Sequence, residues 1–222
     1  MKPTQQQLSV LQDILRKQIT YRETYEEVYD HVLTALTQYD DNIPLMQTVN
    51  NILFKDFGGF AGLRLMERKR RWLIARQMIN KQFWYFSKHF KFPLLPLILL
   101  IFCFFFYFAD KIKLNIVGWF ILVAMAIIPV FIRGIRYFKT GYFSNDTKKS
   151  INDFPFKIIG IIPFYITFWI IIVEVKNWKE LTISTPVPID PLIFSLLSTL
   201  YIIYTISYFM LNQDEYKKLQ VK

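Results

Sequence analysis

Four long runs of apolar residues, almost free of charge, constrain this chain more than any other feature. They cover residues 92–109, 114–132, 158–173 and 192–211, and charged residues stand at or near their ends. Because hydrocarbon offers no water to backbone groups, a run of about 17–25 such residues crosses a bilayer as a helix. The pattern predicts four membrane-spanning helices, with kinks at Pro129 and Pro163 in the second and third.

Composition supports this class and excludes others. Hydrophobic residues make up 53% of the 222 residues, and 22 of them are Phe, which is too apolar for an ordinary soluble domain or a disordered chain. The single Cys excludes an intramolecular disulfide and a cysteine zinc cluster. The polar first residues predict that no signal peptide opens the chain.

The basic residues predict the orientation of the spans. Residues 64–91 contain nine Lys and Arg against one acidic residue, six more lie between positions 133 and 157, and three lie in the C-terminal tail. The two remaining loops carry two each. Lys and Arg near span ends are retained on the cytoplasmic side, so this alternation predicts a bacterial-type cytoplasmic membrane protein with both termini in the cytoplasm.

The first 63 residues are acidic and predict a small helical domain. Apolar residues recur there at separations of three and four, as one face of a helix requires, with a first helix after Thr4, a second over 21–36 and a third beginning at Pro44. Gly58 and Gly59 predict a left-handed end to the third helix. The expected fold is all-α: a cytoplasmic three-helix domain (1–63), a basic amphipathic neck helix (64–91), a four-helix transmembrane bundle (92–211) and a cytoplasmic tail (212–222).

One face of the second helix is a candidate docking surface for a protein partner. It consists of Glu23, Glu27, Asp30 and His31. Such a face suits a basic partner or the chain's own basic neck, and the alternative is an ordinary solvated face. Glu27 and His31 have the spacing of two metal ligands, but no third ligand and no H-E-x-x-H pattern is evident, so no metal, cofactor or catalytic site is predicted.

The neck is a candidate membrane-surface segment. Its basic residues share the segment with aromatic ones, and the candidates are Arg68, Lys69, Arg70, Arg71, Arg76 and Trp84. A nucleic-acid patch is the alternative, but a helix beside anionic lipid headgroups explains both the charge and the apolar residues of a segment that leads into the first span. We therefore expect the lipid bilayer, and no nucleic acid, as the neck's partner.

The fourth apolar run carries a small polar face, made of Ser195, Ser198, Thr199 and Thr205. Such residues usually allow membrane helices to pack closely. The alternative is a solute path in a small transporter or channel subunit. Substrate paths are usually marked by ionisable residues at mid-depth, and here Asp110, Arg133, Glu174 and Asp190 all stand at span ends.

Residues 8–62 combine three sequence features: Arg22 with Glu23, the E-x-x-D-H motif of Glu27, Asp30 and His31, and Asp56-Phe57-Gly58. With these features the segment resembles the HAAS signalling domain. This resemblance implies a cytoplasmic helical domain placed before membrane helices or permease modules, often beside PadR-type regulators. The resemblance therefore implies an adaptor or signal-coupling protein that docks a regulator or permease, and no enzyme activity.

Overall fold

The structure is a computed structural model that describes residues 3–39, 44–112, 116–140, 149–177 and 190–220. Its regular elements are α-helices, which confirms the predicted all-α class. The chain divides into two compact units. We call Met1–Arg76 with Tyr137–Phe154 the N-terminal unit, and Gln77–Arg136 with Pro155–Lys222 the apolar unit.

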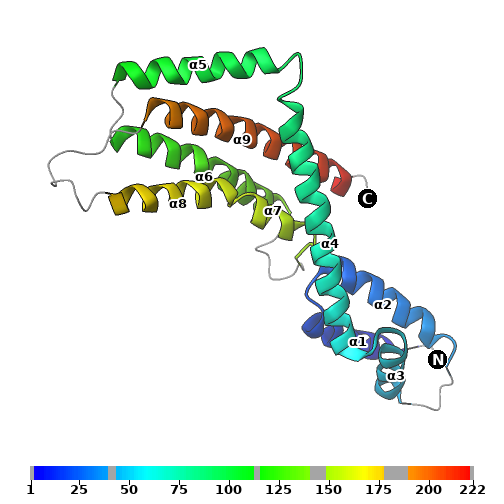
Figure 1. Cartoon of the computed structure of the whole chain (residues 1–222). Helices are drawn as coiled ribbons and strands as arrows, with labels where there is room; N and C mark the ends of the chain where they lie inside the picture. Colours follow the sequence, from blue (N-terminus) through cyan, green and yellow to red (C-terminus); the bar gives the residue numbers. More distant parts are fainter. Residues whose placement is uncertain (1–2, 40–43, 113–115, 141–148, 178–189, 221–222) are drawn as a thin grey trace. The chain divides into compact units, whose positions relative to one another are not determined.

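The N-terminal unit contains the three predicted helices, α1 (Gln5–Gln18), α2 (Arg22–Leu36) and α3 (Leu45–Phe57) (Figure 1). Thr4 begins α1 with a capping box, because its hydroxyl accepts the N–H of Gln7 while the Gln7 side chain accepts the N–H of Thr4. Gly58 ends α3 in the left-handed conformation, with φ of 69°. These local signals explain why the predicted helix limits are close to the observed ones.

A single hydrophobic core holds these helices together. The buried side chains come from the faces that the periodicity predicts, and they are Leu11, Leu15, Val28, Val32, Leu36, Val49, Ile52 and Leu53, joined by Leu63. Tyr25 and Tyr29 pack against this core from α2, with their rings stacked. The first three helices therefore fold as one small bundle.

Helix α4 (Gly59–Lys88) follows directly and contains most of the predicted neck. It begins five residues earlier than the predicted neck, because the turn between α3 and α4 takes only the left-handed Gly58 and Gly59, with φ of 69° and 72°. Its residues up to Arg76 belong to the N-terminal unit, and those from Gln77 onward belong to the apolar unit. The neck is thus one continuous helix shared by both units.

Besides the second half of α4, the apolar unit contains α5 (Leu95–Ile112), most of α6 (Ile116–Lys139) and of α7 (Asp153–Ile159), and α8 (Ile162–Asn177) and α9 (Pro191–Gln220). In Figure 1 the C-terminal ends of α5 and α8 lie at the same end of the bundle as the N-terminal ends of α6 and α9. Successive long helices therefore run in alternating directions. Ala109, Leu122, Ala126, Phe194 and Tyr201 form the shared core of α5, α6 and α9.

Within the described residues, three helical stretches are long and apolar enough to cross a membrane: Val117–Lys139, Asp153–Val173 and Pro191–Lys217. The apolar part of α5, Leu95–Ala109, is shorter and at 1.5 Å per residue covers only about 22 Å of a core about 30 Å thick. Helix α5 begins three residues after the start of the predicted first span, since Pro93 disfavours helix at Phe92 and residues 92–94 form a turn. These three helices indicate a multi-pass membrane protein.

Candidate functional site

The first turn of α2 needs hydrogen-bond acceptors that its own sequence does not supply. Its N-cap residue, Tyr21, makes no side-chain cap, so the N–H groups at the helix start depend on other segments. Glu67 of α4 supplies the acceptor: its carboxylate receives the N–H of Thr20 at 3.1 Å and that of Tyr21 at 3.0 Å. Glu67 is only 5% exposed, and its negative charge is also favoured at a helix N-terminus.

The same turn of α2 binds the segment that precedes α7. Glu23 accepts the N–H of Ile151 at 3.0 Å and the hydroxyl of Ser150. The N–H of Arg22 donates to the carbonyl of Lys149 at 3.0 Å, and a single parallel β-bridge joins Tyr21 to Lys149. Residues 149–151 are therefore fixed to the start of α2 through both side-chain and backbone contacts.

Helix α4 also contacts the beginning of α7 directly. The guanidinium of Arg71 lies over the Phe154 ring, 4.5 Å from its centroid, and Trp72 meets the same ring edge-on at 5.7 Å. We call Tyr21, Glu23, Glu67, Ser150 and Ile151 the α2 hub. The hub holds together the two segments through which the N-terminal unit continues along the chain into the apolar helices, α4 and residues 149–154.

The structure places the four predicted docking residues in different surroundings. Glu23 belongs to the hub, and Glu27 forms an ion pair with Arg70 of α4, with Nη1 and Oε2 2.5 Å apart. Asp30 is exposed. His31 lies 2.8 Å from Asp56 of α3 and packs edge-on against Phe57. Part of the acidic face thus meets the chain's own neck, which was one of the two partners that the sequence left open.

The predicted membrane-surface residues also separate into two groups. Arg68, Lys69, Arg76 and Trp84 are exposed on α4. Arg70 and Arg71 are half-buried and contact Glu27 and Phe154. Only the first group is exposed at the surface of α4.

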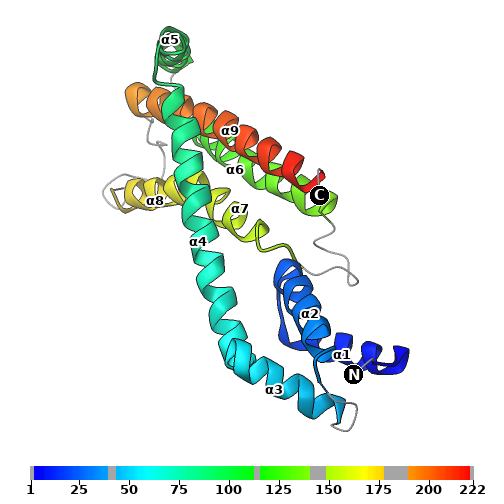
Figure 2. The same ribbon diagram turned by 90° about the vertical axis from the view of Figure 1, so that its right-hand side faces the viewer.

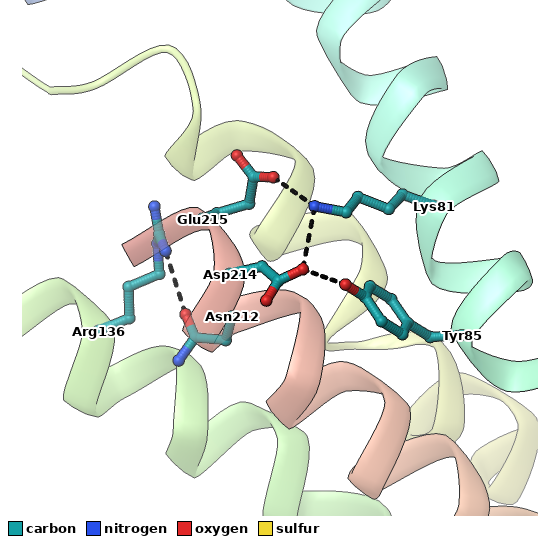
Figure 3. Close-up of polar contacts among 6 residues, drawn as sticks. All are labelled: Lys81, Tyr85, Arg136, Asn212, Asp214 and Glu215. Carbon is teal, nitrogen blue, oxygen red and sulfur yellow. Dashed lines mark hydrogen bonds and ion pairs between the residues drawn. The ribbon is translucent and has the colours of Figure 1, made fainter. Parts of the chain in front are cut away.

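In the apolar unit, the second half of α4 is joined to α9 by the polar cluster shown in Figure 3. Lys81 Nζ lies 2.9 Å from Glu215 Oε1 and 3.4 Å from Asp214 Oδ2, and the Tyr85 hydroxyl donates to Asp214. We call Lys81, Tyr85, Asp214 and Glu215 the α4–α9 cluster. Burial lowers the pKa of Lys81, but the hydrogen bond and charge of Glu215 outweigh it, so that the pKa is raised. Burial, followed by the hydrogen bond to Asp214, raises the pKa of Tyr85. Lys81 therefore stays charged and Tyr85 neutral at physiological pH.

A buried arginine lies beside this cluster. Arg136, near the end of α6, is 2% exposed, donates to Asn212 of α9 at 3.1 Å and lies over the Phe156 ring of α7, 4.1 Å from its centroid (Figure 3). Helices α6, α7 and α9 are therefore joined at the level where α9 changes from apolar to polar residues.

The third apolar run breaks between α7 and α8, at Gly160 and Ile161. Pro163 has no N–H to bond the carbonyl of Ile159, four residues earlier, and the Tyr204 hydroxyl of α9 donates to that carbonyl instead at 2.6 Å. The Tyr208 hydroxyl donates to the Phe156 carbonyl at 3.1 Å. The third run is thus interrupted as Pro163 predicts, whereas α6 continues as a helix through Pro129.

The predicted polar face of α9 lies mostly inside the apolar unit. Ser195, Ser198 and Thr199 are buried, and Thr205 is half-buried. The hydroxyl of Ser195 donates to the Pro191 carbonyl at 2.5 Å and that of Thr199 to the Ser195 carbonyl at 2.7 Å. The hydroxyls of Ser195 and Thr199 are thus satisfied within their own helix, as is common where membrane helices pack closely, whereas the buried hydroxyl of Ser198 has no hydrogen-bond partner among the described residues.

The sequence interpretation missed Glu67, residues 149–151 and Arg136. One signal was available for Glu67, because it is the only acidic residue among nine basic ones in residues 64–91. A carboxylate that is buried in so basic a segment needs a specific hydrogen-bond or charge partner. No comparable local signal marks Ser150, Ile151 or Arg136, whose partners lie far away in the sequence.

In the part of the chain that the structure describes, no group of three His, Cys, Asp or Glu side chains could hold a metal ion. Comparisons with protein-family models, curated proteins and solved structures found no match.

Proposed function

We propose that this protein is an integral membrane adaptor or signal-coupling protein. Its N-terminal unit lies in the cytoplasm and docks a regulator or a permease, and four helices span the cytoplasmic membrane with both termini inside. Three apolar helices of sufficient length, together with α5, and the concentration of basic residues at alternate helix ends support this arrangement.

The observation that carries the proposal is the α2 hub. Glu67 and Glu23 connect the start of α2 to α4 and to residues 149–151, and these are the segments that continue into α5 and into α7–α8. A partner that shifts α2 would therefore act on both segments at once. Such an arrangement suits a protein that passes a binding event from a cytoplasmic domain to membrane helices.

The exposed part of the acidic face is the proposed docking surface. Asp30 is exposed and Glu27 is paired with the half-exposed Arg70, so a basic partner can engage the first and compete for the second. Such competition would release Arg70 from α2 and loosen the contact between α2 and α4. The resemblance of residues 8–62 to the HAAS domain points to the same kind of partner.

Copurification tests the docking proposal. The full-length protein is expressed in its native host with the products of the genes beside its own, and the variant E27K/D30K is compared with D13K, a charge reversal at an exposed position of α1. We expect the double variant to lose a regulator or permease that wild type and D13K retain. Equal recovery with all three proteins would contradict docking through this face.

The rival function is a small transporter or channel subunit whose polar α9 face lines a path. The internal hydrogen bonds of Ser195 and Thr199 favour the adaptor. Purified protein in liposomes separates the two functions, because the rival requires a solute or ion flux that S195A or T199A abolishes. The adaptor requires no such flux.

A further inference from the structure

An exposed stripe runs along α4. In the N-terminal unit it comprises Leu65, Lys69, Trp72 and Arg76, and in the apolar unit it continues with Ile79 and Phe83. Successive members are separated by four and three residues, which places them on one face of a helix. Trp72 is 54% exposed and Phe83 is 69% exposed. We call these six residues the α4 stripe.

The α4 stripe carries charge of only one sign. The sole acidic residue of α4 is Glu67, and its carboxylate is buried in the α2 hub. Arg68 and Lys88 add exposed positive charge beside the stripe. The surface that covers the stripe must therefore accept aromatic and aliphatic side chains and be negatively charged.

Contacts within the apolar unit show at which level along α9 the second half of α4 lies. This half crosses α9 rather than running along it, as both Figure 1 and Figure 2 show. It meets α9 through the pair of Lys81 with Glu215 and through Gln82, which donates to the Tyr204 carbonyl at 3.5 Å. The ion pair lies just past the end of the apolar run of α9, beside Asn212, whereas the Gln82 contact lies seven residues, or about 10 Å, inside that run. A helical segment that crosses a membrane span there, here residues 77–88, lies at the boundary between headgroups and acyl chains.

The pattern of the stripe distinguishes a lipid surface from a second copy of the chain. Apolar Leu65, Trp72 and Ile79 alternate with Lys69 and Arg76 at the core positions of a helix pair. A second copy would bring these like charges together in the seam, which opposes association. An anionic bilayer instead attracts the charges at its phosphate groups and accepts the apolar side chains below them.

We propose that the α4 stripe binds the anionic cytoplasmic surface of the bilayer in which this chain is embedded. Trp72, Ile79 and Phe83 enter the boundary between headgroups and acyl chains, and Lys69 and Arg76 face lipid phosphates. Arg70 and Arg71 take no part, because they are half-buried against Glu27 and Phe154. Trp72 touches the Phe154 ring only edge-on and remains exposed. The inference rests on the membrane insertion proposed above.

Nitroxide labels on the full-length protein in vesicles test this proposal. The only native cysteine is replaced (C103A), and single cysteines are introduced at Phe83 on the stripe, at Ile128 in the middle of α6 and at exposed Asn50 on α3. For each label, accessibility to oxygen is compared with accessibility to a water-soluble nickel chelate. The vesicles contain phosphatidylcholine with or without phosphatidylglycerol.

In vesicles with phosphatidylglycerol, we expect the ratio of oxygen accessibility to nickel-chelate accessibility to be severalfold higher for the label at Phe83 than for the label at Asn50. The variant K69Q/R76Q should lower the ratio of bound to free α4 by about 30-fold, since each basic side chain near an anionic surface contributes about a factor of five. The control K17Q/K55Q removes two exposed charges from the N-terminal helices and should leave the ratio unchanged.

Two results would overturn the inference. A label at Phe83 as open to the nickel chelate as the one at Asn50 would show that water covers the stripe. Spin–spin broadening at Phe83 that grows with the protein-to-lipid ratio and ignores phosphatidylglycerol would show that a second copy covers it. The label at Ile128 reports separately on membrane insertion, so failure of the proposed membrane topology is distinguishable from failure of the stripe.

Discussion

Removing the Glu67 carboxylate should open the start of α2. In E67A the N–H groups of Thr20 and Tyr21 lose their acceptor, and a hydrogen bond to a charged group contributes about 1.5–3 kcal/mol. Thr20 is exposed, so water can replace Glu67 there, whereas Tyr21 is half-buried and bears most of the loss. We therefore expect a net cost of about 2–3 kcal/mol, which is a factor of about 30–150 in the local opening equilibrium.

Hydrogen–deuterium exchange of the detergent-solubilised full chain measures this loss. Peptides that cover Tyr21 and Arg22 should exchange about 30–150 times faster in E67A than in wild type. The control E26A removes an exposed carboxylate of α2 that lies 3.9 Å from Arg22, a pair worth at most about 0.5 kcal/mol. Exchange in E67A within twofold of wild type would refute the role given to Glu67, and equal acceleration in E26A would show that the effect is not specific to the hub.

Three further substitutions, two of them with a comparison substitution, test the apolar unit, each by unfolding in a mixed micelle titrated with a denaturing detergent. Y204F leaves the Ile159 carbonyl without its donor and should cost about 1–3 kcal/mol, whereas the exposed Y165F should change stability by less than about 0.5 kcal/mol. G160A should destabilise the protein, because its Cβ would lie 2.9 Å from the Phe156 carbonyl oxygen and the Tyr208 hydroxyl. G134A, whose Cβ would have nothing within 4 Å, should stabilise the protein by about 0.5–1 kcal/mol. A stability change of the same sign in both variants would contradict the packing at Gly160. K81M removes the ammonium group that pairs with the buried Glu215 and should cost about 1–2 kcal/mol, and an unchanged midpoint would show that this ion pair adds nothing to stability.

The sequence predicts the helices well because their signals are local. Thr4 with Gln7, Pro44 and Gly58 are within one turn of the helix ends that they determine, and the buried stripes of α1 to α3 follow the helical period. The apolar runs likewise depend on composition alone. The first run forms a shorter helix than predicted, since only Leu95–Ala109 of it is an apolar helix.

The functional contacts are much harder to predict, because they join residues far apart in the chain. Glu67 reaches Tyr21 across 46 positions, and Glu23 reaches Ile151 across 128. Charge and periodicity mark Arg68 to Arg71 as one basic run, yet the phase of α4 turns Arg70 toward Glu27 and leaves Arg68 and Lys69 exposed. That separation depends on the packing of α4, which a composition argument does not contain.

The membrane topology tests the central claim most directly. Reporter proteins are fused after Lys88, Lys139 and Lys217, and after Lys111 and Asn177, with a fluorescent protein that matures in the cytoplasm and a phosphatase that is active only outside it. Four spans with an internal N-terminal unit predict fluorescence at the first three sites and phosphatase activity at the other two. Phosphatase activity after Lys88, or a full-length protein that stays soluble without detergent, would contradict the account.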